Sequence, residues 1–410
     1  MKNPLRIAMH FALALGALLL YHRAALAETV TLQWWDYLKD SAGDVKGVDD
    51  LIAGYQASHP NVKIERTSFA FGDLKTKIIQ AAATGTMPDI VIIDNPDHQA
   101  MAAQGALADI TAQVKGWRDK DQYFPGPWAS TVYQGKNYGV PYKSNATALF
   151  FNEDLLRQAA IQSPPKTWDE LRKAAKALTK GNVSGFCFSA VNTEEGTFTV
   201  LPFLWAAGGD IQTIGDGASV EMLKFLNTMV NVDKSVPASV STLSQGDVNN
   251  LFMAGQCAMM INGPWQIPGL KANANVKFKW GVSGWPYKVK PVSILGGENF
   301  AIGANSHVKE AWDVIAWAVQ PDHLIPALKS HGQFAARKDA AADPYFNSDP
   351  LQKAFAQAVA VAKPRAYGPK YPKMSEEIMR MVAGVLSGAQ TPEQAAAASS
   401  KAIKPLLVGK

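Results

Sequence analysis

The sequence of 410 residues lacks the short motifs that mark several common classes of enzyme. It has no G-x-x-x-x-G-K-[ST] phosphate loop, no H-E-x-x-H pair, no C-x-x-C and no G-x-S-x-G nucleophile elbow. The 7 histidines are scattered, without the close spacing of a metal site on a helix. We therefore expect no metal, no cofactor and no enzymatic activity. Acidic residues occur throughout, so the paired carboxylates of a glycosidase remain a distant alternative.

Cysteine is nearly absent, with Cys187 and Cys257 as the two occurrences. Each lies in an apolar, strand-like segment, GFCFS and GQCAMM. If the chain is exported, an oxidising compartment permits a disulfide between them. Two separate buried thiols that pack as small hydrophobic side chains are the other interpretation. The sequence does not show whether the two segments are neighbours, so both interpretations stay open.

Long hydrophobic runs are also missing, apart from one at the N-terminus. Lys2 and Arg6 precede an apolar run over residues 7–20, which Ala25-Leu26-Ala27 follows. A charged start, a short apolar core and an A-x-A end are typical of a cleaved signal peptide. We expect cleavage after Ala27 and no stable membrane insertion afterwards. No cysteine follows that site, so no lipid anchor is expected there.

The chain has little excess charge of either sign. Its formal net charge is +5, and residues 1–27 hold three of the cations (Lys2, Arg6 and Arg23) and no acid, so the remainder carries about +2. No cluster of lysine and arginine provides a local basic patch. This balance gives no reason to expect a nucleic acid partner.

Strand and helix patterns alternate along the first part of the chain. In TVTLQWWDYLKD, Val30, Leu32 and Trp34 alternate with polar residues, which predicts a strand. Apolar residues at helical spacing follow, then NVKIERTSF, a second helical pattern and the wholly apolar PDIVII. A buried strand of that kind is typical of a parallel sheet. This order predicts an α/β fold with helices on both faces of a sheet.

Six segments in the same order resemble a known family, the extracytoplasmic sugar-binding proteins of ABC importers. They are ATGTMPDIVIIDNPDHQAMAAQGALADIT, YGVPYKSNATALFFNEDLLRQAAIQSPPKTWDELRKAAKAL, LPFLWAAGGDI, FMAGQCAMMINGPWQIPGL, GGENFAI and HGQFAARKDA. Together they cover nearly the whole chain after the signal peptide, and INGPW is similar to maltose/maltodextrin-binding proteins in particular. The resemblance implies a periplasmic, monomeric protein with two α/β lobes, each a mostly parallel sheet flanked by helices.

The same resemblance implies where the lobes lie. One lobe is expected from residues 28–142 plus 300–340, and the other from 143–299 plus 341–410. The crossings would lie near 142–145, near 296–300 and around 341. Such proteins hold a solute in the cleft between the lobes and close around it by a hinge.

The end of the first strand carries the first candidate ligand residues, Trp35, Asp36 and Tyr37. Strand ends at the carboxyl edge of such a sheet face the cleft, and a turn there would expose these side chains. Aromatic rings cover the C–H face of a sugar, while carboxylates accept hydrogen bonds from its hydroxyl groups. Trp34 alternates with Leu32, so we expect it in the core.

Further candidates follow from positions that match the family. Asp94 and Asn95 come after the DIVII strand, although either residue could instead cap the next helix. Tyr142, Lys143 and Asn145 lie at the first crossing in VPYKSN. Maltose-binding relatives carry an acid where Asn145 stands, which puts maltose itself in doubt. Lys143 could also be a solvated surface charge.

Trp265 in NGPW is the strongest single candidate, because Gly263 and Pro264 form a turn that can project its indole into the cleft. Its alternative is a core tryptophan of the second lobe. Gly297, Glu298 and Asn299 lie at the second crossing, where glycine lets backbone approach a ligand closely. A hinge turn without ligand contact is the other interpretation.

The remaining candidates lie in two less regular segments. Glu195 and Phe198 precede LPFLWAAGG, and Arg365, Tyr367 and Lys370 lie in PRAYGPKYPK, a loop that approaches the cleft in relatives. A cation over the cleft would favour an anionic ligand. The sequence therefore predicts a carrier that delivers a carbohydrate to an inner-membrane ABC permease. A carrier of glycerol phosphate or a glycerophosphodiester is the alternative, and an exported glycoside hydrolase using Asp36 and Glu298 is more remote.

Overall fold

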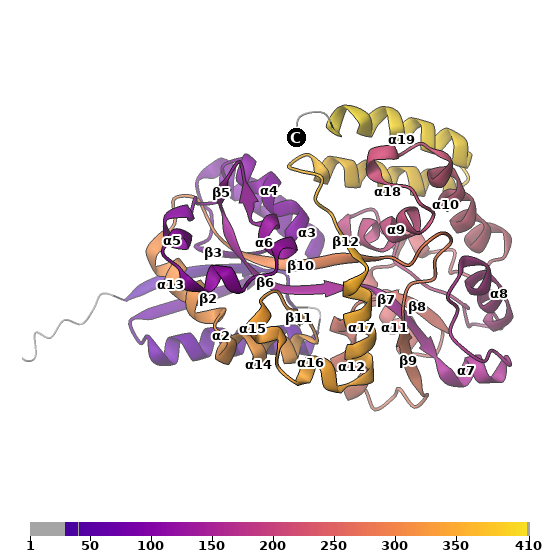
Figure 1. Ribbon diagram of the computed structural model, residues 1–410, viewed down its shortest axis with the longest axis horizontal. Coiled ribbons are helices and arrows are strands. Elements are labelled where there is room, and N and C mark those ends of the chain that lie inside the picture. The colour runs from indigo at the N-terminus through magenta and orange to yellow at the C-terminus, as the bar shows by residue number, and fades with distance from the viewer. Residues whose placement is uncertain (1–28, 40, 408–410) are drawn as a thin grey trace, which may run out of the picture.

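The computed structural model describes residues 29–39 and 41–407 (Figure 1). The expected signal peptide and its cleavage site after Ala27 lie outside these residues. Within the described part of the chain, no helix is long and apolar enough to cross a membrane.

A seven-stranded sheet forms the centre of the first half of the molecule, in the order β11-β6-β10-β3-β1-β2, with β12 paired to β10. The first three strands in the chain are parallel to one another, whereas β10 is antiparallel to β3 and β6. Their bounds are β1 (Val30–Asp36), β2 (Val62–Ser68), β3 (Ile90–Asp94), β6 (Gly139–Ala146), β10 (Ser293–Ile302), β11 (Phe334–Ala335) and β12 (Ala362–Pro364).

Helices cover this sheet and bury the apolar side of β1. Leu32 and Trp34 are in the core, as the alternation predicts, and Trp34 packs edge-on against Phe300 of β10. The first half also contains a separate two-stranded sheet of β4 (Val132–Tyr133) and β5 (Lys136–Asn137). The helices are α2 (Ala42–Ser58), α3 (Phe71–Thr84), α4 (Asn95–Ala103), α5 (Thr111–Lys115), α6 (Pro125–Ser130), α13 (Val308–Ala318), α14 (Pro321–His331), α15 (Lys338–Ala341) and α16 (Tyr345–Ser348).

The second half of the molecule is built on a three-stranded sheet, β8-β7-β9, with helices around it (Figure 1). Its strands are β7 (Ala148–Asn152), β8 (Met259–Asn262) and β9 (Trp280–Ser283). The helices are α7 (Glu153–Gln158), α8 (Trp168–Leu178), α9 (Glu194–Ala206), α10 (Gly217–Asn227), α11 (Gln245–Met253), α12 (Ile267–Ala272), α17 (Pro350–Ala360), α18 (Tyr371–Leu386) and α19 (Pro392–Leu407). Short 3₁₀ or π turns occur at Arg118–Gln122, Ile211–Thr213, Thr228–Val232, Val240–Thr242 and Pro264–Gln266.

Strand direction in this second sheet differs from the expectation. β7 is antiparallel to both β8 and β9, and the parallel pairings nearby are isolated bridges such as Cys187 with Met260. One of these bridges joins Ser184 to Cys257, which brings the two cysteines together. Cys187 and Cys257 form a disulfide. The α/β class is confirmed. In the first sheet β1 to β3 are parallel to one another and β12 is parallel to β10, whereas β10 and β6 make the antiparallel pairings.

Two long strands, β6 and β10, run side by side between the two halves (Figure 1). Tyr142 of β6 and Phe300 of β10 pack in the first core, whereas Ala146 and Ile294 at the other ends of the same strands pack in the second half. Phe346 still packs in the first core and Phe355 in the second half. By packing, the chain therefore passes from the first core to the second half between Phe346 and Phe355, and the lobe bounds themselves stay a prediction.

Candidate functional site

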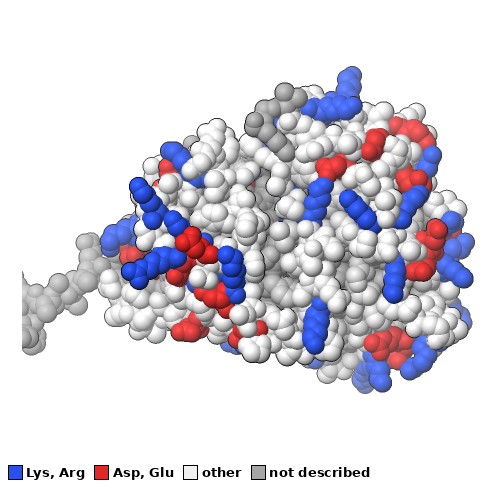
Figure 2. Space-filling model, in the orientation of Figure 1, with Lys and Arg blue, Asp and Glu red and all other residues white. Residues whose placement is uncertain are grey.

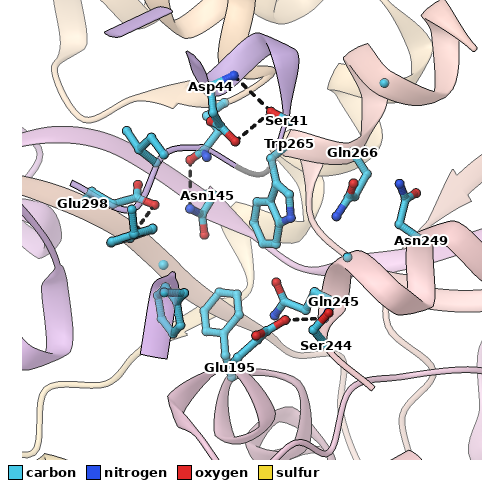
Figure 3. Close-up of a pocket in the computed structure, with 18 of the residues that line it drawn as sticks. Ser41, Asp44, Asn145, Glu195, Ser244, Gln245, Asn249, Trp265, Gln266 and Glu298 are labelled. Atoms are coloured by element: carbon cyan, nitrogen blue, oxygen red, sulfur yellow. Dashed lines mark hydrogen bonds between the residues drawn. The ribbon is translucent and has the colours of Figure 1, made fainter. Parts of the chain in front are cut away.

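A cavity of about 630 Å³ lies where the two halves meet along β6 and β10. Its wall combines side chains from the first half, from the second half and from the two crossing strands (Figure 3). The lining residues are Tyr37, Leu38, Ser41, Ala42, Asp44, Phe71, Asp94, Asn145, Glu195, Phe198, Ser244, Gln245, Gly246, Asp247, Asn249, Asn250, Met253, Trp265, Gln266, Gly269, Asn273, Gly296, Gly297, Glu298, Gln333 and Arg365.

Trp265 and Phe198 form an aromatic wall on the side of the second half. Their ring centroids are 6.3 Å apart and the planes are tilted by 35°. Trp265 lies on the 3₁₀ turn after Gly263, and its indole folds back over that glycine. A Cβ at Gly263 would lie 1.9 Å from the indole ring, so only glycine leaves room for this arrangement. Figure 3 shows the half-buried indole directed into the cavity.

The first of two buried cations at the cavity, Lys143, lies beneath it between two acids. Its Nζ is 3.6 Å from Asp44 Oδ1 and 3.8 Å from Glu298 Oε2. Asp44 accepts a hydrogen bond from Ser41 Oγ at 2.8 Å and lies 2.9 Å from His331 Nδ1. These contacts hold the Asp44 carboxylate in the first turn of α2 at the cavity wall.

Burial and ionic contacts set the protonation of this first cluster. Burial raises the pKa of Asp44, but Lys143 and His331 outweigh it and lower that pKa to about 2. Burial, assisted by Lys143, lowers the pKa of His331 to about 4. Burial also raises the pKa of Glu298. The positive charge of Lys143 opposes this rise but does not cancel it. Asp44 is therefore ionised and His331 neutral at neutral pH.

The second buried cation, Arg365, follows β12 and joins the two halves. Its guanidinium donates to Asp94 of β3 at 3.1 and 3.2 Å, to Asn95 at 3.3 Å and to Glu194 of α9. It also lies 4.5 Å from the centroid of the Phe198 ring. Burial raises the pKa of Asp94 to about 7, with Arg365 opposing that rise and Glu194 adding to it.

The N-terminus of α11 forms a polar edge of the cavity that the sequence analysis did not identify. Ser244 caps this helix in a capping box with Asp247. The backbone N–H of Gln245 donates a hydrogen bond to the Glu195 carboxylate. Asn249 and Asn250, one turn further along, also line the cavity. The S-x-x-D spacing signals the cap, but nothing local in the sequence shows that this helix faces the cavity.

Half of the predicted ligand residues line the cavity: Tyr37, Asp94, Asn145, Trp265, Gly297, Glu298 and Arg365. Glu195 and Phe198, which precede LPFLWAAGG, line it as well. Ser41, Asp44, Phe71, Gln266, Asn273 and Gln333 belong to the wall and were not predicted. Contact of these residues with a ligand stays a prediction.

The expectation that Trp35 and Asp36 lie on an exposed turn needs correction. The strand β1 continues through Asp36, so the alternation carries that side chain inward to complete burial. Asp36 accepts from Arg66 Nε at 2.7 Å and from Trp34 Nε1 at 2.9 Å. Trp35 packs edge-on against Phe69, 5.0 Å away. Both side chains stabilise the first half and lie outside the cavity wall.

Five other predicted residues also lie outside the wall and support it from behind. Tyr142 is buried with its hydroxyl 2.7 Å from His331 Nε2, and Lys143 is buried rather than a solvated surface charge. Asn95 begins α4 and contacts Arg365. Asn299 donates to Ser130 Oγ and Tyr367 to Asp210, each at 2.9 Å.

The described residues include no group of three or more His, Cys, Asp or Glu side chains that could hold a metal ion. The arrangement instead offers aromatic faces, amide groups and carboxylates around one space. These groups suit a polar organic solute that also has apolar faces.

Comparison with known proteins identifies the family. The model of the bacterial extracellular solute-binding proteins matches residues 50–354. A probable ABC transporter-binding protein of Deinococcus radiodurans is 26% identical over 414 aligned positions, which cover 93% of this chain and 95% of that protein.

Two solved structures share the fold closely. A solute-binding protein of an ABC transporter from Thermotoga lettingae, bound with α-D-tagatose, superposes with a TM-score of 0.86 at 26% identity and covers 92% of this chain and 100% of its own. The GacH receptor of Streptomyces glaucescens, solved unliganded and with acarbose, gives 0.84 at 26% identity, covering 92% and 98%. The chain belongs to the family of bacterial extracellular solute-binding proteins.

Proposed function

We propose that this protein is a monomeric periplasmic carrier that captures a neutral carbohydrate, from a monosaccharide to a short oligosaccharide, and delivers it to an inner-membrane ABC permease. One observation carries the proposal: the cavity places the Trp265 and Phe198 rings beside the acids Asp44 and Glu298 and the amide of Asn145. The tagatose and acarbose complexes of the two structural relatives support the same class of solute.

The chemistry of a sugar matches these groups. The C–H face of a pyranose or furanose ring packs on a flat aromatic side chain, and its hydroxyl groups donate to carboxylates and amide oxygens. Hydrogen bonds to charged acceptors are stronger than those between neutral groups. A buried acceptor that a solute leaves unpaired costs free energy, so the same groups discriminate among sugars.

The charge of the wall argues against the glycerophosphate alternative. Five carboxylic acids line the cavity (Asp44, Asp94, Glu195, Asp247 and Glu298), whereas Arg365 is the single lysine or arginine among the lining residues. Arg365 is already paired with Asp94 and Glu194. Lys143 lies behind Asp44 and Glu298, and Lys370 does not line the cavity. An anionic solute would meet repulsion at this wall.

The hydrolase alternative loses its acid pair. Asp36 is buried under Arg66 and lies outside the cavity wall, so it cannot act with Glu298 on a glycosidic bond. Known family members act by binding, and we infer that this chain does so without covalent chemistry. Lysine and arginine side chains lie dispersed beside acids on the face that Figure 2 shows, and we expect no nucleic acid partner.

Capture of the solute then depends on contacts that it makes with both halves at once when the lobes are closed. Trp265 and Phe198 belong to the second half and Asp44 to the first, so a solute that touches all three stabilises the closed arrangement of the lobes. Arg365 already links the halves without a solute. We predict the lobes as 28–142 plus 300–340 and 143–299 plus 341–410, and a shift of the last bound by a few residues leaves the cavity between them.

A thermal-shift screen of residues 28–410 tests the proposal, with D-tagatose, maltose, lactose, maltotriose and glycerol 3-phosphate as probes. A solute at 100 times its dissociation constant stabilises the folded protein by about 2.7 kcal/mol, which raises the melting temperature by several degrees. We expect such a shift with a neutral sugar. A shift with glycerol 3-phosphate alone would contradict the proposal.

A variant pair then locates the site. Trp265→Ala removes the central aromatic face, so the affinity for the sugar found in the screen should fall at least about 30-fold, as for other buried aromatic contacts. Trp280→Ala is the matched control, because Trp280 is half-buried against Phe150 and away from the cavity. Titration calorimetry should give unchanged affinity for that control. Equal affinity of both variants would refute the placement of the site.

A further inference from the structure

Asn145 Oδ1 is a buried acceptor at the cavity without a hydrogen-bond partner among the described residues, and Glu298 Oε2 has only an ionic contact, with Lys143 Nζ at 3.8 Å. Their side chains are 4% and 6% exposed, and both line the cavity. Asn145 comes from β6 and Glu298 from β10, and these two strands are hydrogen-bonded neighbours. A buried polar atom without a partner destabilises the folded protein, so its presence at a cavity wall points to a partner that arrives with the solute.

The direction of the Asn145 amide has a structural cause. Its Nδ2 donates to Gln333 Oε1 at 2.9 Å, and Gln333 is itself buried. This bond engages the amide nitrogen with the protein and leaves the amide oxygen to face the other way. An amide can donate or accept, and the bond to Gln333 selects between these two roles.

The space for that oxygen is provided by a glycine of the neighbouring strand. A Cβ on Gly296 would lie 2.1 Å from Asn145 Oδ1 and 2.7 Å from the edge of the Phe198 ring. Because Gly296 has no side chain, Asn145 Oδ1 and the edge of the Phe198 ring can both lie close to the backbone of β10 at this residue. An aromatic face and a free acceptor lie next to each other there, which is the pairing that one sugar unit requires.

We propose that Gln333 is a positioning residue: it fixes Asn145 as a pure acceptor, so that Asn145 and Glu298 together select a sugar unit that offers free hydroxyl donors. This inference rests on the proposed function and defines the solute more narrowly. A deoxy or O-methylated unit would leave one acceptor buried and unpaired. It should therefore bind about 10- to 100-fold more weakly than the parent sugar.

Substitutions at Gln333 test the positioning role. Gln333→Met removes the acceptor at nearly constant volume, which frees the Asn145 amide to turn. Gln333→Glu keeps an acceptor for Asn145 Nδ2 and is the conservative control, because an ionised carboxylate can accept but not donate. If the amide were paired the other way round, with its oxygen toward residue 333, the glutamate variant would be the more damaging one.

The quantity to measure is the ratio of the affinity for a sugar to the affinity for its monodeoxy form, and not the stability of the protein. D-tagatose, maltose and lactose are titrated by calorimetry, and the monodeoxy forms of the sugar that binds most tightly follow. In the wild-type protein and in Gln333→Glu, removal of one particular hydroxyl should weaken binding about 10- to 100-fold. In Gln333→Met that ratio should fall to within about threefold, since the acceptor no longer faces the cavity. An unchanged ratio in Gln333→Met, or its loss in Gln333→Glu, overturns the inference.

A second measurement separates this inference from the proposed function. If none of the sugars binds the wild-type protein, the proposed function fails, and the ligand-free protein still decides the role of Gln333. The side-chain NH₂ group of Asn145, followed by NMR, should exchange slowly with solvent in the wild type and in Gln333→Glu. It should exchange rapidly in Gln333→Met, and equal exchange in all three proteins would refute the positioning role.

Discussion

The two buried cations at the cavity differ in how they are satisfied. Arg365 donates to Asp94, Asn95 and Glu194 at hydrogen-bond distance, whereas Lys143 lies 3.6 and 3.8 Å from its two acids and has no hydrogen-bond partner among the described residues. A planar guanidinium engages several acceptors at once, while an ammonium acts as a point charge. The arginine cluster therefore links the two halves. The lysine in the other cluster favours the ionised form of the two acids at the cavity wall, Asp44 and Glu298.

The same difference appears in the acids. Asp44 beside Lys143 has a pKa lowered to about 2, because His331 and Ser41 also bond its carboxylate. Asp94 beside Arg365 has a pKa raised to about 7, because burial and the second acid, Glu194, outweigh the arginine. One cluster holds an acceptor at the wall, Asp44, that is ionised at neutral pH, and the other holds an acid, Asp94, with a pKa near neutral pH.

The largest expected effect is the removal of each cation. Arg365→Met leaves Asp94 and Glu194 buried without their shared partner, so the free energy of unfolding should fall by about 3–5 kcal/mol. Lys143→Met should cost less, about 1–3 kcal/mol, because Asp44 keeps His331 and Ser41. Urea unfolding of both variants measures this. A larger loss for Lys143→Met would reverse the comparison.

An exposed pair provides the control for this series. Arg380 pairs with Glu377 on the surface of α18, and its side chain is 71% exposed. Arg380→Met should therefore change the free energy of unfolding by less than about 0.5 kcal/mol.

The next effect is the pH dependence of stability. The pKa of Asp94 is higher in the folded protein than its ordinary value of 3.8, so its contribution to stability is complete below about pH 4 and is lost as the pH rises through 7. From pH 5 to 8, wild type should lose unfolding free energy relative to Asp94→Asn. The pKa values of His98 and His331 fall to about 4 through burial and act in the opposite sense, but they contribute equally to both proteins.

Asp44→Asn is the matched control for that experiment. The pKa of Asp44 is lowered, so its contribution is present above about pH 4 and is lost only as the pH falls toward 2. The difference between wild type and Asp44→Asn should therefore stay constant from pH 5 to 8. Parallel curves for the Asp94 and Asp44 variants would contradict the assigned directions.

The last comparison is between two buried tyrosines, one in each cluster, and the expected difference between them is small. Tyr371 donates to the Glu194 carboxylate at 2.7 Å, and Tyr142 lies 2.7 Å from the neutral imidazole of His331. Hydrogen bonds to charged groups contribute more, so Tyr371→Phe should lower the unfolding free energy by about 1.5–3 kcal/mol and Tyr142→Phe by about 1 kcal/mol. Equal losses in chemical denaturation would show that the two clusters do not differ in this way.

The sequence predicts those features that depend on local pattern. The alternation in β1 places Leu32 and Trp34 in the core, and the apolar PDIVII segment is the buried β3. Resemblance to the family adds the two halves and Trp265 at the cavity. Asp36 was misplaced because its partner, Arg66, lies on the next strand, thirty residues away.

The remaining features depend on contacts between distant segments. Asp44, Lys143, Glu298 and His331 come together from α2, β6, β10 and α14, and no short motif contains them. The orientation of α11 and the bond between Asn145 and Gln333 are set in the same way. A local pattern can identify a helix cap or a strand, but it does not show which side chains meet across the cavity.

A crystal structure of residues 28–410 with the neutral sugar that gives the largest thermal shift tests the central claim most directly. We predict one sugar ring packed on Trp265 and Phe198, with hydroxyl groups within hydrogen-bond distance of Asn145 Oδ1 and Glu298 Oε2. A sugar bound elsewhere on the protein, with this cavity occupied by water, would contradict it.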